Sequence, residues 1–195
     1  MGNGKEVEKF ALVGAACVGK TTLLNDLREA SSQRPDVVFL DEVARDFFQQ
    51  NPTDPSEVFS LGIQSRLQDL ILEREQQAHA LKPTFIICDR SVLDSPVHLK
   101  AMGDEEGANK LLERVHFWLP TYNCFFLLDP KDILYEQDKI RRESEETRNS
   151  IHQAFIDFFQ QHGSIPFRVL SGSLEERLRL LQGILAGNES VREST

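Results

Sequence analysis

The sequence predicts an α/β fold, a three-layer sandwich in which a five-stranded parallel sheet carries helices on both faces. Five short apolar runs alternate with segments of helical periodicity, an order typical of repeated β-α-β units. The runs are apolar almost throughout, as expected of strands that are buried on both faces. They cover residues 9–13, 37–40, 84–88, 123–128 and 167–170 of the 195-residue chain. This length suits one domain, which we place at residues 1–186, followed by a disordered tail at 187–195.

A glycine-rich motif follows the first apolar run. The segment from Gly14 to Thr21 reads Gly-x-x-x-x-Gly-Lys-Thr, and the leucines after it continue a helical pattern to about Ala30. A strand, this motif and a helix form the P-loop arrangement, in which backbone N–H groups and a helix N-terminus surround a phosphate. We therefore predict a P-loop NTPase sandwich that binds ATP and Mg²⁺, with Lys20 on the β- and γ-phosphates and Thr21 on the metal. The predicted nucleotide-binding residues are Gly14, Ala15, Ala16, Cys17, Val18, Gly19, Lys20, Thr21 and Thr22.

Two acidic residues, Asp41 and Glu42, end the second apolar run, and a helix is expected at residues 43–48. Phosphoryl transfer to a hydroxyl needs a carboxylate that orients the hydroxyl or takes its proton. Both are catalytic candidates, because the sequence does not say which of them points inward. Arg45 lies three residues after Glu42 and would share its helical face, where both could contact an acceptor molecule. We expect this strand to be the neighbour of the P-loop strand in the sheet.

A long helix is expected between the second and third strands. After an Asn-Pro-Thr break, Asp54 is a suitable N-cap, Pro55 a suitable first-turn residue, and Glu57 follows three residues after the cap. Apolar residues at helical spacing carry this helix to about Leu81. On it, Gln64 is a candidate acceptor-binding residue, because its amide could hydrogen-bond to the edge of a base.

The third apolar run, residues 84–88, leads directly into Asp89 and Arg90. Apolar residues followed by an aspartate are typical of a Walker B strand, whose carboxylate holds Mg²⁺ directly or through water. We therefore predict Asp89 as a metal-binding and catalytic residue, the alternative being a simple strand end. Arg90 is a catalytic candidate because a guanidinium is permanently charged and can contact a phosphate with two donors.

A charged segment follows the fourth strand, at residues 129–148. It contains Arg142, which we predict as a catalytic residue of a lid that closes over the phosphates. Interleaved glutamates leave the alternative of an ordinary solvated face. Ser173 and Glu176 have the spacing of a capping box and predict the start of the last helix. The other expected helices lie near residues 96–101, 105–118 and 149–161, and the last ends near residue 185.

The composition limits the partners. The chain carries 31 acidic and 22 basic side chains, a formal charge of −9, and shows no basic patch of the kind that nucleic-acid binders carry. No apolar run has the length of a membrane span, and no signal peptide precedes the first strand. The three cysteines are far apart and suggest neither a disulfide framework nor a zinc site. We expect a cytoplasmic protein that acts on a small molecule, without nucleic acid or membrane partners, and leave its oligomeric state open.

These motifs resemble those of NadR-type ATPases, which include nicotinamide-riboside kinase domains, and more distantly those of deoxynucleoside and thymidylate kinases. The segments that carry the resemblance, in the family's order, are the P-loop and residues 41–45, 61–64 and 88–94. The resemblance implies that Glu42 and Arg45 face the acceptor, that Asp89 serves Mg²⁺ and that lid arginines close on ATP. Asp89 is followed by Arg-Ser, which is closer to the deoxynucleoside-kinase pattern, so the identity of the acceptor stays open.

The predicted function is Mg·ATP-dependent phosphoryl transfer to a hydroxyl of a small nucleoside-like acceptor. The alternative is a regulatory nucleotide switch with no small-molecule acceptor. A switch specific for guanine would show Asn-Lys-x-Asp after a strand, but the Asn109-Lys110 pair lacks the aspartate and lies in an expected helix. A motor ATPase is disfavoured, because the chain leaves little room for a second domain.

Overall fold

All five strands belong to one parallel sheet, whose order across the sheet is β2-β3-β1-β4-β5. The computed structural model describes residues 6–130 and 144–189. The strands are β1 (Glu8–Val13), β2 (Val37–Leu40), β3 (Phe85–Asp89), β4 (Cys124–Leu128) and β5 (Phe167–Leu170). The predicted α/β sandwich is therefore confirmed. The predicted place of β2 is wrong: β3, which is buried at every position, pairs with β1, whereas the partly exposed β2 lies at the edge.

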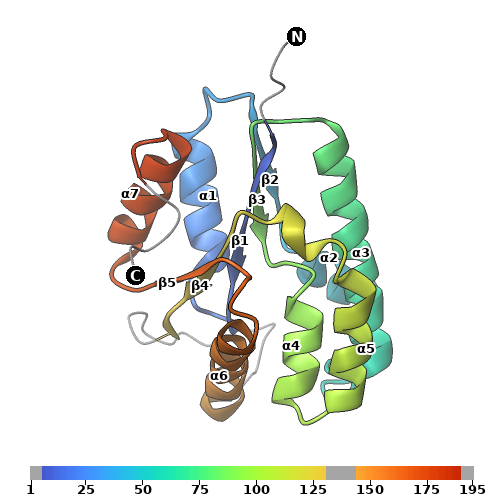
Figure 1. Cartoon of the computed structure of the whole chain (residues 1–195). Helices are drawn as coiled ribbons and strands as arrows, with labels where there is room; N and C mark the ends of the chain where they lie inside the picture. Colours follow the sequence, from blue (N-terminus) through green and yellow to red (C-terminus); the bar gives the residue numbers. More distant parts are fainter. Residues whose placement is uncertain (1–5, 131–143, 190–195) are drawn as a thin grey trace.

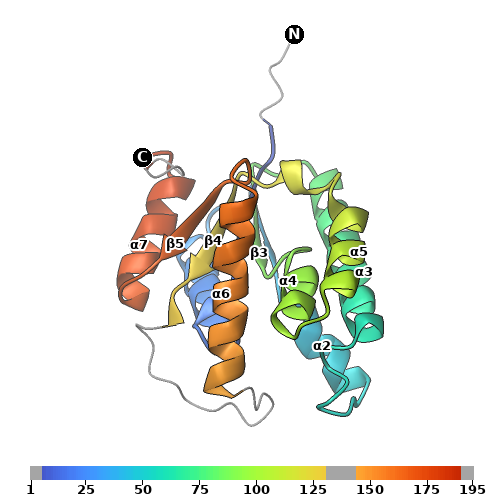
Figure 2. The same ribbon diagram turned by 60° about the horizontal axis from the view of Figure 1, so that its bottom comes forward.

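The helices cover both faces of this sheet. They are α1 (Lys20–Ala30), α2 (Val43–Gln50), α3 (Leu61–Ala80), α4 (Asp94–Ala101), α5 (Glu105–Val115), a 3₁₀ turn (Leu119–Thr121), α6 (Glu145–Gln161) and α7 (Leu174–Leu185). Figure 1 shows α1 and α7 together on one face and α3, α4 and α5 on the other. Helix α6 packs beside α4, as Figure 2 shows from below. The strands point towards the bottom of Figure 1, so the loops that follow them gather at that edge.

Aromatic side chains fill the core on both sides of the sheet. Phe125 and Phe126 of β4 are both fully buried and, as neighbours on a strand, point to opposite faces. The ring of Phe126 lies 5.8 Å from that of Phe10 in β1, and the ring of Phe125 lies 5.6 Å from that of Phe159 in α6. Phe159 also stacks on Phe167 of β5 at 4.5 Å. The strand ends that carry the functional loops are therefore held by a packed core.

The long helix α3 begins later than predicted. Its N-cap is Ser60, whose hydroxyl accepts a hydrogen bond from the backbone N–H of Ile63. Asp54 instead accepts hydrogen bonds from the backbone N–H and the hydroxyl of Ser56, at 2.9 and 2.6 Å. The prediction of Asp54 as the N-cap was wrong because a short acidic side chain satisfies a turn as readily as a helix end.

Other helix ends differ by a turn or less. Helix α5 stops at Val115, before the 3₁₀ turn, and α6 begins earlier than predicted because Ser144 caps it by accepting from the N–H of Thr147. The capping box of Ser173 and Glu176 at the start of α7 is confirmed. Of the predicted tail, residues 190–195 lie outside the described residues. No helix within residues 6–130 and 144–189 has both the length and the apolar content needed to cross a bilayer.

Candidate functional site

The P-loop leaves β1 at Gly14 and enters α1 at Lys20. Gly14 and Gly19 have φ angles of +129° and +84°, in the region that favours glycine. A Cβ on Gly14 would also lie 3.3 Å from the carbonyl oxygen of Leu128, so the loop approaches β4 too closely for a larger residue. Gly19 is the N-cap of α1, and the free N–H groups of a first helical turn attract an anion. The local backbone thus has the geometry of a phosphate-binding loop.

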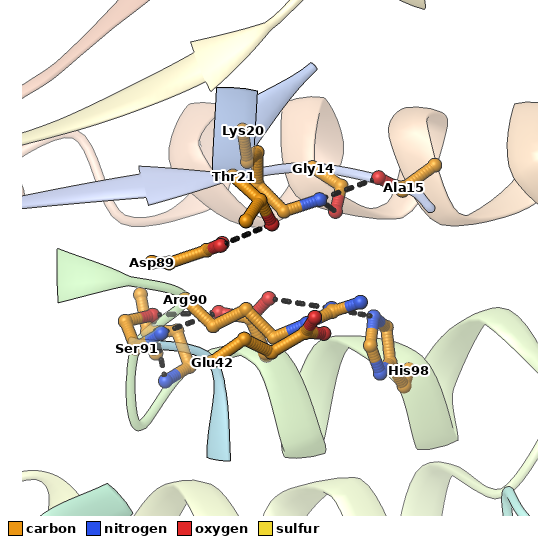
Figure 3. A network of polar contacts seen from close by, with 11 residues as sticks. Gly14, Ala15, Lys20, Thr21, Glu42, Asp89, Arg90, Ser91 and His98 are labelled. Atoms are coloured by element: carbon orange, nitrogen blue, oxygen red, sulfur yellow. Dashed lines mark hydrogen bonds and ion pairs between the residues drawn. The ribbon is translucent and has the colours of Figure 1, made fainter. Parts of the chain in front are cut away.

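Lys20 is buried under this loop. Its Nζ donates to the carbonyl oxygens of Gly14 at 2.9 Å and Ala15 at 2.6 Å, as Figure 3 shows. Burial lowers the pKa of Lys20 to about 8, the guanidinium of Arg90 acts in the same direction, and nearby carboxylates, first Asp89, oppose the shift. The ammonium group is therefore poorly solvated, and a triphosphate would provide a charged partner for it.

Thr21 and Asp89 meet beside the loop. The Thr21 hydroxyl donates to Oδ2 of Asp89 at 2.6 Å. The other carboxylate oxygen, Oδ1, is buried and has no hydrogen-bond partner among the described residues. Burial raises the pKa of Asp89, so a cation would stabilise its charged form. A hydroxyl and a carboxylate with an unused oxygen are the hard ligands that Mg²⁺ prefers, so the two residues fit the predicted metal.

Glu42 and Arg90 form a buried ion pair at the same edge of the sheet. Nε of Arg90 donates to Oε1 of Glu42 at 2.5 Å, and Nη1 donates to Oδ1 of Asp94 at 3.1 Å. The side chains of all three residues are at most 6% exposed. Arg90 therefore lies between two carboxylates. From the sequence, Arg45 was expected on the same helical face as Glu42, and Asp94 was given no role although it lies only four residues from Arg90.

The backbone at Arg90 is itself unusual. Its φ of +79° is left-handed, which costs a residue with a side chain about 1–2 kcal/mol. The N–H of Arg90 donates to the carbonyl of Leu12 in β1 at 3.0 Å. The next residue, Ser91, donates from its N–H and its hydroxyl to Oδ2 of Asp94. His98, one turn further along α4, has its Nε2 3.4 Å from Nη1 of Arg90. The conformation that turns Arg90 towards Glu42 is thus fixed by several contacts.

The other residues predicted near Glu42 point elsewhere. Asp41 is exposed and pairs with Arg28 of α1 at 2.5 Å, so Glu42 is the inward carboxylate. Arg45 is exposed on α2. Glu42 is the N-cap of α2 and has an extended backbone, so the helical spacing that was to join it to Arg45 does not apply. Gln64 is 2% exposed, and its Nε2 donates to the carbonyl of Val58 at 2.9 Å.

Two buried arginines reach the P-loop from distant parts of the chain. Arg148, in the first turns of α6, donates from Nε to the carbonyl of Ala16 at 3.1 Å. Arg177 of α7 donates from Nη1 to the carbonyl of Val18 at 3.3 Å. Sequence reasoning placed Arg148 in the charged segment and did not single out Arg177, which reads as an ordinary helix residue. The predicted lid residue Arg142 lies outside the described residues.

A family model described as an AAA domain matches residues 9–177, which include every contact described above. The chain belongs to this family. Among curated protein sequences, none matches the chain.

Solved structures show the same fold. NadR, in complex with NAD and AMP-PNP, is 16% identical, with a TM-score of 0.70 over 97% of this chain. The chain spans only 52% of NadR. Deoxyadenosine kinase from M. mycoides with bound dATP is 15% identical, with a TM-score of 0.65, covering 92% of this chain and 99% of the kinase. Thymidylate kinase from Ehrlichia chaffeensis is 15% identical, with a TM-score of 0.63, covering 92% and 98%. The predicted resemblance is therefore confirmed for the family and the fold.

Substitution of Asp89 by asparagine should weaken the use of Mg²⁺ more than the binding of nucleotide. The amide keeps the shape of the side chain but removes the charge that would attract the cation, and lost metal-site contacts typically reduce metal affinity about 10- to 100-fold. A Mg²⁺ titration of ATP turnover should shift to higher concentration by that factor. Asp69→Asn is the control, because the side chain of Asp69 is partly exposed and pairs with Arg114 of α5. An unchanged titration would mean that Asp89 only ends its strand.

Cys17 should be alkylated faster than the other two cysteines, and Mg·ATP should protect it. Cys17 is half-buried in the P-loop, whereas Cys88 and Cys124 are 2% and 1% exposed. Burial also raises the pKa of the Cys88 thiol, which lowers its thiolate fraction. Labelling rates with iodoacetamide can be read by peptide mass spectrometry with and without Mg·ATP. Equal rates at the three positions, or no protection, would contradict the assignment of the loop.

Proposed function

We propose that this protein transfers the γ-phosphoryl group of Mg·ATP to a hydroxyl of a small nucleoside-like acceptor, within a single domain of residues 1–186. The observation that carries the proposal is the buried carboxylate of Glu42, held by Arg90 beside the P-loop. The charge of Glu42 acts on the pKa values of both Lys20 and Asp89, so the three groups share one site. A site that only binds a nucleotide has no need of such a carboxylate, whereas phosphoryl transfer to a hydroxyl needs one that orients the hydroxyl or takes its proton.

Each group has a role that its surroundings support. Lys20 would leave the loop carbonyls for the β- and γ-phosphates, while the N–H groups of the loop bind the phosphate oxygens. Thr21 and Asp89 would hold Mg²⁺, which when bound neutralises charge on the phosphates. Glu42 would accept a hydrogen bond from the acceptor hydroxyl and take its proton as the phosphoryl group is transferred. Arg148, which contacts the loop at Ala16, brings positive charge to the phosphate side.

The charges at the acceptor side favour a neutral hydroxyl over a phosphate as the group that is phosphorylated. Glu42 and Asp94 both contact Arg90, so its positive charge is already balanced. Among the described residues that pair with Arg90, two buried carboxylates, those of Glu42 and Asp94, share its one guanidinium. A phosphate dianion beside Glu42 would meet like charge in a region of low dielectric constant, which is costly.

The relatives of known fold support this proposal in outline. NadR has been solved in complex with NR, and deoxyadenosine kinase with bound dATP and dCTP. Both are proteins whose ligands join a sugar to a base. Because the identities are about 15%, the acceptor of this chain has to be found by experiment.

The test is a panel of acceptors with Mg·ATP, scored for acceptor-dependent release of ADP. The panel pairs each nucleoside, nicotinamide riboside included, with its 5′-monophosphate. We expect at least one nucleoside to stimulate ADP release and its monophosphate to be a poor acceptor. Stimulation of ADP release by monophosphates alone would indicate a nucleotide kinase instead of a nucleoside kinase. ADP release that no acceptor stimulates would favour the alternative function, a regulatory nucleotide switch.

A further inference from the structure

The loop between β3 and α4 is attached to the rest of the protein at Val92, two residues after Arg90. The N–H of Val92 donates to the hydroxyl of Tyr122 at 3.3 Å. Its carbonyl accepts from Nε2 of Gln68, at 3.1 Å, and the same amide also donates to the carbonyl of Leu111. Val92, Gln68 and Tyr122 are all buried. Both polar groups of one loop residue are therefore bound by side chains from outside the loop.

The hydroxyl of Tyr122 is oriented by a buried carboxylate. It donates to Oε1 of Glu75 in α3 at 2.5 Å, and burial raises the pKa of Tyr122 so that this proton is retained. Because the proton points to Glu75, the hydroxyl oxygen is left to accept from Val92. Val92 therefore donates to Tyr122, and Tyr122 donates to Glu75, so the loop is linked to Glu75 by two hydrogen bonds in series.

Glu75 is in turn fixed by two donors. Lys9 Nζ in β1 donates to its Oε2 at 2.8 Å, and Trp118 Nε1 donates to the same oxygen at 2.7 Å. Lys9 and Glu75 are 0% and 1% exposed, and the ammonium group of Lys9 lies 3.6 Å from the centre of the Tyr122 ring. An ion pair enclosed in this way cannot relax towards water, so it is a rigid support.

The side-chain amide of Gln68 also has only one possible orientation. Its NH₂ group lies between two carbonyl oxygens, and its own oxygen is buried without a hydrogen-bond partner among the described residues. A reversed amide would place oxygen against oxygen, so only this orientation is acceptable. The Gln68 side chain therefore keeps its hydrogen bond to the carbonyl of Val92, although its own oxygen has no partner among the described residues.

From these contacts we infer that Tyr122 and Gln68 are positioning residues that hold the Val92 loop so that Arg90 meets Glu42. The loop needs such support because Arg90 has a left-handed backbone, which persists only where its surroundings fix it. The catalytic part of this inference rests on the proposed function, whereas the anchoring of the loop does not. The side-chain hydrogen bonds of this network join Tyr122, Glu75 and Lys9 to one another, to Val92 and to Trp118, and in the described residues none of them is made to a residue of the P-loop.

The test combines hydrogen exchange with kinetics on the full chain. Tyr122→Phe keeps the ring but removes the hydroxyl, and Gln68→Met keeps the length of the side chain but removes the NH₂ group. In each variant we expect amide exchange in the peptide covering residues 89–95 to rise about fivefold to tenfold, the effect of one lost hydrogen bond. Exchange in the P-loop peptide should stay unchanged. With an acceptor found by the panel, kcat should fall about tenfold to a hundredfold, since small misplacements of a catalytic group have effects of this size, and KM for ATP should stay within about twofold.

Ile184→Val is the matched control, because it removes a buried methyl group from α7, on the face of the sheet opposite to α4 (Figure 1). It should leave kcat and loop exchange within about twofold of the wild type. Unchanged amide exchange of the loop in both test variants would contradict the inference that Tyr122 and Gln68 hold the loop in place. Raised loop exchange with a kcat no lower than that of the control would overturn the positioning role. Failure of the proposed function would give a different result, because the wild type itself would then phosphorylate no acceptor. The exchange measurement would still decide whether Tyr122 and Gln68 hold the loop.

Discussion

Substitution of Glu42 by glutamine should lower turnover about 10²- to 10⁴-fold while leaving ATP binding close to that of the wild type. General base catalysis typically contributes an effect of this size. The amide of glutamine can still accept a hydrogen bond from Arg90, so the shape of the site should be kept. It cannot take the proton of an acceptor hydroxyl. Turnover is measured as acceptor-dependent ADP release, and ATP binding by calorimetry.

Asp41→Asn is the control for this variant. Asp41 precedes Glu42 in the chain, but its carboxylate is exposed and pairs with Arg28 on the surface. Exposed pairs of this kind contribute about 0–1 kcal/mol to stability, so the control should behave as the wild type. A larger loss of turnover in Asp41→Asn than in Glu42→Gln would transfer the catalytic role to Asp41.

Substitution of Lys20 by alanine should weaken triphosphate binding about tenfold to a hundredfold. The lysine is the point charge of the P-loop, and a hydrogen bond to a charged group contributes about 1.5–3 kcal/mol. Because Lys20 is buried and its two loop acceptors are neutral carbonyls, a phosphate has little competition for its charge. Lys110→Ala removes an exposed lysine of α5 and should bind ATP normally. Near-normal ATP affinity in a folded Lys20→Ala protein would refute the P-loop assignment.

The parts of the fold that could be predicted are those that depend on local sequence patterns. Fully apolar runs predicted the strands, and the spacing of Gly14, Gly19 and Lys20 predicted the P-loop, because both depend on residues that are neighbours in the chain. The order of the strands could not be predicted in the same way. It depends on which run is buried on both faces, and β2 proved to be the edge strand.

The candidate site shows the same division. That carboxylates would follow β2 and β3 was visible in the sequence. Asp89 and Thr21, both predicted as metal-binding residues, are joined by a hydrogen bond. The ion pair of Glu42 with Arg90 joins residues 48 positions apart, and no spacing rule connects them. Whether Asp41 or Glu42 points inward depends on the extended backbone at the start of α2. The sequence could therefore indicate which groups gather at this site, but it could not show that Glu42 pairs with Arg90.

The most direct measurement of the central claim follows the phosphoryl group itself. ATP labelled with ³²P in the γ position is incubated with the wild type, Mg²⁺ and the nucleoside that the panel selects, and the products are separated by chromatography. Transfer beside Glu42 predicts a labelled nucleoside monophosphate, formed in step with ADP and reduced about 10²-fold or more in Glu42→Gln. Label that appears only as inorganic phosphate, at the same rate in the wild type and in Glu42→Gln, would contradict the claim.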